Sequence, residues 1–245
     1  MLNRVLNHNF FHELAIVNKN IVSLHDKKYS IFKNGFIPRR NLKMYEEYAR
    51  ICFLSGAEIA TVCNQLEQSI YFMTNFRSTR KLKDNNINRY DHILYHLESH
   101  LIRITSCYDR CLILANNIYM LGNTDSNCKH NIIINNKYIK GSSVGCKLES
   151  IYNFIQPYRK KRNIVIHHAG YNHIDLRKIE GMSILEKQEE DIFLKYYFKK
   201  IIDNFIFDRK SELSEFNNNL FKLIDEFLLE VLVEFHLKYK SLKTI

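Results

Sequence analysis

Apolar residues recur along most of this chain at the spacing of helix turns. Over residues 41–80 and 90–121 they fall three, four or seven positions apart, which predicts two long amphipathic helices. The same spacing predicts further helices over residues 148–169, 186–207 and 211–240. The last of these is nearly apolar all round at its middle. That pattern favours a central helix of a bundle or a contact between subunits.

Two longer stretches break this periodicity. Residues 1–40 are mixed and basic, and Asn34-Gly35 lies between apolar residues, which is a hairpin signal. We expect an N-terminal extension there, with a candidate small hairpin, packed on the bundle. Residues 123–147 are rich in Asn, Lys, Ser and Gly. They predict an insertion between the second and third core helices, in which residues 132–139 suggest another small hairpin.

Shorter signals predict local interruptions. The Ser-Gly-Ala-Glu sequence at residues 55–58 fits a capping box, so the first long helix is expected to restart or kink there. Pro157 predicts a kink or a new first turn, and residues 171–185 predict a polar connection. Because no internal repeat and no long linker is found, we expect one all-α domain over residues 41–245.

The composition supports a helical protein with a substantial core. Hydrophobic residues make up 46% of the 245 residues, whereas the chain has only 7 Gly and 2 Pro, too few for the many turns of an all-β protein. None of the six cysteines forms a C-x-x-C pair, so no metal site or cofactor is expected. Cys107 and Cys111 are expected to be buried. With no signal-peptide pattern and no membrane-length apolar run, we expect a cytoplasmic protein with reduced thiols.

The chain is basic, with a formal net charge of +10 and an isoelectric point of about 9.2. Such a balance indicates an anionic partner, which could be nucleic acid, a membrane surface or an acidic protein. The alternative is that lysines decorate solvated helix faces, because charge informs about association and not about fold.

Residues 158–170 carry the most informative chemistry. Asn163 and His167 are four positions apart, so on a helix they lie one turn apart on one face. The side chain of Arg162 can lean to the same side, and the three apolar residues between Asn163 and His167 are expected to anchor this turn to the core. The pattern predicts a guanidinium, an amide and an imidazole displayed together near a helix end.

These three groups suit the cleavage of RNA. An RNA chain carries its own nucleophile, the 2′-hydroxyl. The catalyst must move protons near neutral pH, for which an imidazole is suited. It must also stabilise negative charge that builds up on the phosphate, and a guanidinium does so with forked hydrogen bonds. Such a scheme requires no metal ion.

The sequence Arg-Asn-x-x-x-His at residues 162–167 resembles the signature motif of the HEPN superfamily. The arrangement is most similar to Cthe_2314-type HEPN proteins, judged by chain length, the Tyr108-Asp109 pair and residues 158–170. The resemblance implies an antiparallel bundle of four to five core helices that usually forms a homodimer. Many HEPN proteins are metal-independent endoribonucleases of toxin–antitoxin, phage-defence or CRISPR systems, and their paired motifs meet across the dimer in one composite site.

By that resemblance, each candidate residue receives a role. Arg162 would stabilise the phosphate, His167 would transfer protons and Asn163 would support them. The substrate-binding and supporting residues would be Arg159, Lys160, Lys161, His168 and Asp109.

Each of these assignments has a plainer alternative. Arg162 and His167 also suit a helix C-terminus, where cations interact favourably with the helix dipole. The three preceding basic residues could form a solvated face, and His168 could be a spare surface residue. Asp109 could make an unrelated hydrogen bond. Arg89 and His96 match the looser spacing R-x6-H by chance, in a region where no active site is expected.

Three functions are compatible with these patterns. The first is an endoribonuclease that acts on RNA as a homodimer, restrained by an antitoxin or another regulatory protein. The second is a HEPN-like module that binds RNA, a nucleotide or a protein without cleavage. The third is an assembly subunit whose contact is formed by residues 211–240.

Overall fold

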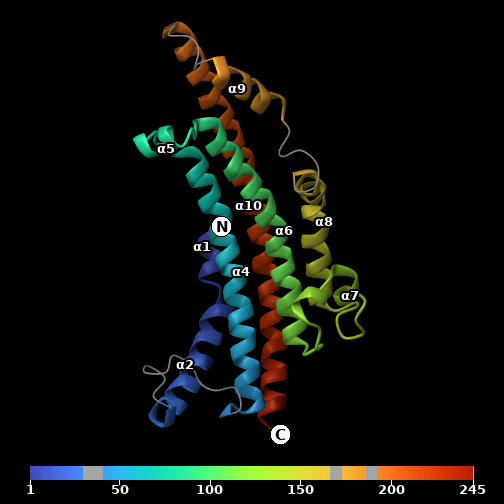
Figure 1. Ribbon diagram of the computed structural model, residues 1–245. Coiled ribbons are helices and arrows are strands. Elements are labelled where there is room, and N and C mark those ends of the chain that lie inside the picture. The colour runs from blue at the N-terminus through green and yellow to red at the C-terminus, as the bar shows by residue number, and fades with distance from the viewer. Residues whose placement is uncertain (30–40, 166–172, 186–191, 245) are drawn as a thin grey trace. The chain divides into compact units, whose positions relative to one another are not determined.

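The structure is a computed structural model that describes residues 1–29, 41–165, 173–185 and 192–244 (Figure 1). Over these ranges the chain is almost entirely helical and contains no β-strand. The predicted all-α helical bundle is therefore confirmed. The elements are α1 (Leu2–Leu6), α2 (Asn9–Tyr29), α4 (Met44–Thr74), α5 (Arg80–Asp84), α6 (Arg89–Ile118), η2 (Asp125–Asn127), α7 (His130–Ile134), α8 (Ser143–Ile164), α9 (Ile174–Leu185) and α10 (Ile192–Lys243).

These helices build two compact units. The first comprises residues 1–63, 106–154 and 220–245, and the second comprises residues 64–105 and 155–219. Helices α4, α6, α8 and α10 contribute residues to both units. In the described ranges, no helix combines the length and the apolarity that a membrane span requires.

Within the first unit, α4, α6 and α10 lie side by side (Figure 1). The ring of Tyr48 stacks on Phe235 with centroids 5.5 Å apart, and its hydroxyl donates to the carbonyl of Ile118 at 3.1 Å. Cys107 and Cys111 are fully buried, as predicted. α10 buries an apolar face here, so its C-terminal half is a central helix of this unit. The fully buried residues of that face are Leu220, Phe221, Ile224, Phe227, Leu228, Val231 and Phe235.

The predicted restart of the first long helix at residues 55–58 is wrong. α4 continues through them because the hydroxyl of Ser55 donates to the carbonyl of Ile51 at 3.0 Å, one turn back, rather than capping a new helix. Asn117 on α6 also donates to this hydroxyl at 2.6 Å. Gly56 permits a close approach, because a Cβ atom at that position would lie 2.6 Å from Cε1 of Phe10. Both residues thus serve packing inside a continuous helix.

The N-terminal segment is helical and is held on the first unit. Phe10 and Leu14 are completely buried, and Nε of Arg4 lies 2.7 Å from Oδ2 of Asp225 on α10. The hairpin predicted around Asn34-Gly35 falls outside the residues that the structure describes. The boundary of an N-terminal extension at residue 40 stays a prediction.

The predicted insertion contains a short helix, α7, where a hairpin was expected. The backbone amides of Ile132 and Ile133 both donate to the carbonyl of Lys129 at 3.0 Å, which closes a helical turn. That turn buries Ile133 completely and brings Nδ1 of His130 within 2.6 Å of the hydroxyl of Tyr108. The helical turn is favoured because it buries Ile133 and places His130 beside Tyr108 at the same time. A strand here would instead need a second strand to pair with.

Residues 174–185 were expected to be a polar connection but form helix α9. Leu176 and Ile179, spaced by one turn, are buried. The amide of Asp175 donates to Nδ1 of His173 at 3.3 Å, so this imidazole accepts a hydrogen bond from the first turn of α9. The helix packs into the core of the second unit. That core consists of Ile70, Met73, Ile93, Leu97, Leu176, Ile179, Phe198, Ile202, Phe205, Ile206 and Leu213.

Helix α10 is continuous where two helices were predicted. Residues 208–210 contain neither Gly nor Pro, so nothing in the sequence ends the helix there. Arg209 and Glu212, three positions apart, form an ion pair just beyond this point, which suits a helix. Pro157 likewise lies inside α8 without ending it.

A buried histidine makes the stability of the second unit sensitive to acid. His100 is 1% exposed, and its Nδ1 lies 2.7 Å from the hydroxyl of Ser69. Its Nε2 has no hydrogen-bond partner in the part of the chain that the structure describes. Burial disfavours the charged imidazolium and lowers the pKa of His100 from 6.5 to about 4. The neutral ring is therefore the form that the fold accepts.

Acidification is expected to destabilise the protein through His100. The unfolded chain binds the proton near pH 6.5 and the folded chain only near pH 4, so this contribution to stability is complete above pH 6.5 and is lost as the pH falls. The loss between pH 7 and pH 4 should be about 3 kcal/mol. Urea denaturation at both pH values measures it. In the variant His100→Asn the free energy of unfolding should depend less on pH, and an unchanged dependence would contradict the prediction.

Candidate functional site

The first two residues of the predicted motif lie in the last turn of α8. Nη1 of Arg162 donates to Oδ1 of Asn163 at 3.2 Å. The Arg162 side chain is half-buried, whereas Asn163 is exposed. A cation at this helix end interacts favourably with the helix dipole. The structure thus brings the guanidinium and the amide together, as the sequence predicts.

The guanidinium of Arg162 has a hydrogen-bonding capacity that is not used. Its Nε atom is shielded from solvent and has no hydrogen-bond partner among the described residues. A shielded donor without an acceptor is unfavourable. The rest of this half-buried guanidinium carries further N–H donors that an oxyanion can accept from.

His167 and His168 fall outside the residues that the structure describes. The spacing of one helix turn between Asn163 and His167 therefore stays a prediction, because α8 is described only to Ile164. The expectation that the apolar residues between them anchor the turn is wrong for Ile164, whose side chain is 50% exposed. The helix end projects this residue toward solvent instead of the core.

The basic residues before the motif divide by environment. Lys160 and Lys161 are exposed and Arg159 is half-buried. Nζ of Lys161 lies 5.2 Å from the ring centroid of Tyr158, and that ring packs on Phe216 of α10 at 4.1 Å. The end of α8 is thereby held on α10 inside the second unit. The exposed lysines suit contacts with phosphate groups and equally suit a solvated face.

Asp109 is exposed on α6 and belongs to the first unit, whereas the motif belongs to the second. Its role as an orienting carboxylate stays a prediction. No group of three or more His, Cys, Asp or Glu side chains in the described ranges is arranged to hold a metal ion.

The chance match at Arg89 and His96 is not arranged for acid–base chemistry near neutral pH. Nη2 of Arg89 lies 2.7 Å from Oδ1 of Asp203, which engages the guanidinium. Burial, His92 and Arg103 lower the pKa of His96 from 6.5 to about 4. The imidazole is therefore neutral at physiological pH and a poor proton donor.

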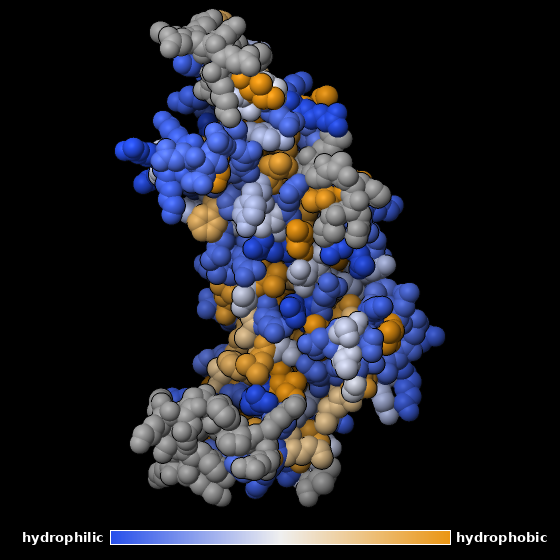
Figure 2. Space-filling model, viewed as in Figure 1, coloured by the Kyte–Doolittle hydropathy of each residue, from blue (hydrophilic) through white to orange (hydrophobic). Residues whose placement is uncertain are grey.

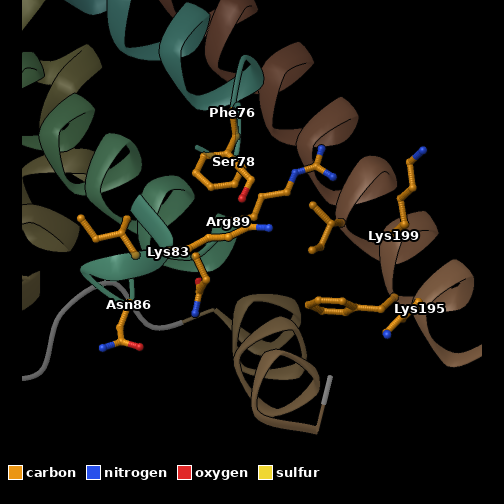
Figure 3. Close-up of a pocket in the computed structure, with 11 residues that line it drawn as sticks. Phe76, Ser78, Lys83, Asn86, Arg89, Lys195 and Lys199 are labelled. Carbon is orange, nitrogen blue, oxygen red and sulfur yellow. The ribbon is translucent and has the colours of Figure 1, made fainter. Parts of the chain in front are cut away.

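Sequence reasoning missed a basic pocket in the second unit. Lys83 and Arg89 from the α5–α6 corner and Lys195 and Lys199 from α10 line a cavity of about 500 Å³ (Figure 3). In the sequence, Lys83 and Arg89 lie six positions apart, whereas Lys195 and Lys199 lie more than a hundred positions further along the chain. Only the interleaving of lysines with aromatic residues in the first turns of α10 hinted at it.

Comparisons with curated proteins and with solved structures find no match. A family model does match, that of the Cthe2314-like HEPN family, over residues 57–206. This range is more than half of the chain and includes most of α4, all of α6 and α8, and the motif at residues 162–167. The helical fold and the Arg-Asn pair at the end of α8 agree with the resemblance seen in the sequence. The chain therefore belongs to the Cthe2314-like HEPN family.

Proposed function

We propose that this protein is a metal-independent endoribonuclease of the HEPN type. One observation carries the proposal: a half-buried guanidinium, that of Arg162, lies beside Asn163 at the end of α8 with a shielded Nε that lacks a partner among the described residues. The part of this guanidinium that is open to solvent can donate charge-assisted hydrogen bonds to phosphate oxygens. The net charge of +10 favours a polyanionic substrate.

The proposed reaction uses the substrate's own nucleophile. His167 accepts the proton of a ribose 2′-hydroxyl, whose oxygen then bonds to the adjacent phosphorus. The bond between phosphorus and the 5′-oxygen breaks, and that oxygen receives a proton from the imidazolium of a second copy's His167. Arg162 stabilises the negative charge on the phosphate oxygens in the transition state. The products are a 2′,3′-cyclic phosphate end and a 5′-hydroxyl end.

A homodimer is part of this proposal, because two proton-transferring groups are needed and each copy supplies one motif. An exposed apolar stripe on α10 supports a contact between copies: Leu229, Val233 and Leu237, spaced by four, are 48%, 56% and 63% exposed. A second copy packed against this stripe would remove its apolar surface from water. If light scattering showed that the protein remains monomeric at high concentration, the composite site would be ruled out.

Product analysis tests the proposed reaction. The protein is incubated with single-stranded RNA in EDTA, and cyclic phosphate ends are expected. The same oligonucleotide with 2′-O-methyl groups should not be cut, because its nucleophile is blocked. Cleavage of the methylated RNA, or cleavage that requires a divalent ion, would refute the mechanism.

A role in a toxin–antitoxin or phage-defence system belongs to the same proposal, since an unrestrained nuclease would damage its own cell. An antitoxin or another regulatory protein would then bind the nuclease in the cytoplasm.

The second candidate function is a HEPN-like module that binds RNA, a nucleotide or a protein without cleavage. The basic pocket favours it, because such a pocket can bind an anion without the motif. RNA binding with no cleavage under any condition would decide for this alternative.

A further inference from the structure

The basic pocket is a preformed cavity with a cationic lining. It lies between the α5–α6 corner and the first turns of α10, and its volume of about 500 Å³ is within the range of ligand sites. Figure 3 shows Lys83 and Arg89 on one side of the space and Lys195 and Lys199 on α10 across from them. Phe76 and Phe198 supply apolar lining. No acidic residue is among the lining residues that the structure describes.

The lysines give this pocket its net charge. Arg89 is engaged by Asp203 at 2.7 Å, which holds its side chain in place and offsets its charge. Lys83, Lys195 and Lys199 are exposed and form no ion pair within the described ranges. The surface over α5 is almost wholly hydrophilic (Figure 2). Three uncompensated cations around one cavity favour phosphate groups as ligands.

An aromatic patch adjoins the basic pocket. We define it as the rings of Tyr71, Phe72, Phe76, His92, Tyr95 and His96. Phe76 belongs to both features, because it lines the cavity and its ring centroid lies 5.1 Å from that of His92. The patch continues from His92 to His96, with centroids 4.5 Å apart.

The rings of this patch are held in place and open to solvent. Nε2 of His92 lies 2.6 Å from the carbonyl of Phe72, and the ring of His96 contacts those of Phe72 and Tyr95 at 5.7 and 5.2 Å. Tyr71 is 63% exposed, Phe72 47% and Tyr95 66%. Exposed aromatic rings beside a cationic groove are the elements with which proteins bind single-stranded nucleic acid, because bases stack on the rings.

We infer that the basic pocket and the aromatic patch together bind a single-stranded segment of RNA, with phosphates on the lysines and bases against the exposed rings. The inference rests on the proposed function for the identity of the polymer, since the segment belongs to the RNA that is cut. A duplex is excluded because its bases are stacked on one another and offer no face to the rings. A free mononucleotide would fill the pocket but leave most of the patch unused.

Binding of a 2′-O-methyl oligonucleotide tests the inference without cleavage. In the double variant Lys83→Ala/Lys195→Ala, the plot of log affinity against log salt should be shallower by about 0.7 for each lysine removed. The double variant Tyr71→Ala/Tyr95→Ala should bind about 5- to 150-fold more weakly for each stacked base that is lost. Lys140→Ala and Tyr138→Ala, which remove an exposed lysine and an exposed tyrosine of the first unit, should bind like the parent.

The outcomes separate this inference from the proposed nuclease activity. Weakened binding in both double variants, with no cleavage of ordinary RNA by the parent, would support the binding site and refute the nuclease. Normal binding in both variants, with cleavage intact, would refute the binding site alone. The binding site for single-stranded RNA would also be refuted if duplex RNA bound as tightly as the single-stranded oligonucleotide, or if a mononucleotide bound as tightly or more tightly. A change of oligomeric state in the tyrosine variant, without a change in RNA binding, would refute it as well.

Discussion

The variant Arg162→Ala is expected to cleave RNA about 100- to 1,000-fold more slowly than the parent. Removal of one preorganised donor that stabilises charge in a transition state has an effect of that size. The side chain has the features such a donor needs, because it is half-buried, lies beside Asn163 and has a shielded Nε with no partner in the described part of the chain. The initial rate of cleavage of a fluorescent RNA at saturating concentration measures the effect.

Companion variants show which property of Arg162 matters. Arg162→Lys keeps the charge but loses the planar fork, so cleavage should remain strongly impaired. Lys140→Ala removes an exposed cation of the first unit, away from the motif, and is expected to change the rate little. His167→Ala should abolish cleavage, since proton transfer would be lost. If Arg162→Ala and His167→Ala cut RNA as fast as the parent, the assignment of the site is wrong.

The variant Phe227→Ala should lower the free energy of unfolding by about 3–5 kcal/mol. The Phe227 ring is completely buried on α10, within the apolar face that forms the core of the first unit. Truncation removes buried apolar surface and leaves a cavity that a close-packed core fills only in part. Chemical denaturation followed by circular dichroism measures the loss.

The same helix offers a matched control. Phe207 lies on α10 but is 73% exposed, so Phe207→Ala removes a phenyl ring from solvent instead of from a core. Since alanine has the higher helix propensity, this variant is expected to be as stable as the parent or slightly more stable. Equal destabilisation by the two substitutions would contradict the placement of α10 in the core.

Much of the fold was predictable because helix periodicity is a local property. The helix predicted over residues 90–121 agrees with α6, and the one predicted over residues 148–169 agrees with α8 as far as it is described. Apolar spacing in each case marks the face that is buried, so element type and core face follow together. The Arg-Asn pair was found for the same reason, since adjacent residues need no distant partner to be recognised.

The errors fall where a distant segment decides the local structure. The sequence of residues 55–58 predicted a helix cap. An unbroken α4 is favoured instead, because Phe10 packs against Gly56 and Asn117 donates a hydrogen bond to Ser55. Residues 174–185 were predicted to be a polar connection. Helix α9 forms there because Leu176 and Ile179 are buried in the apolar core of the second unit. Tertiary contacts override weak local preference in both cases.

The sequence by itself determined the helical class, the buried faces of the main helices, the basic charge and the HEPN motif, because each depends on residues close together in the chain. Only the tertiary structure decided that α4 and α10 are continuous and that Nε of Arg162 is shielded. It alone brought Lys83 and Arg89 to one cavity with Lys195 and Lys199. The physical reason is that burial and charge density in a site depend on which distant segments pack together, and a local pattern does not encode that choice.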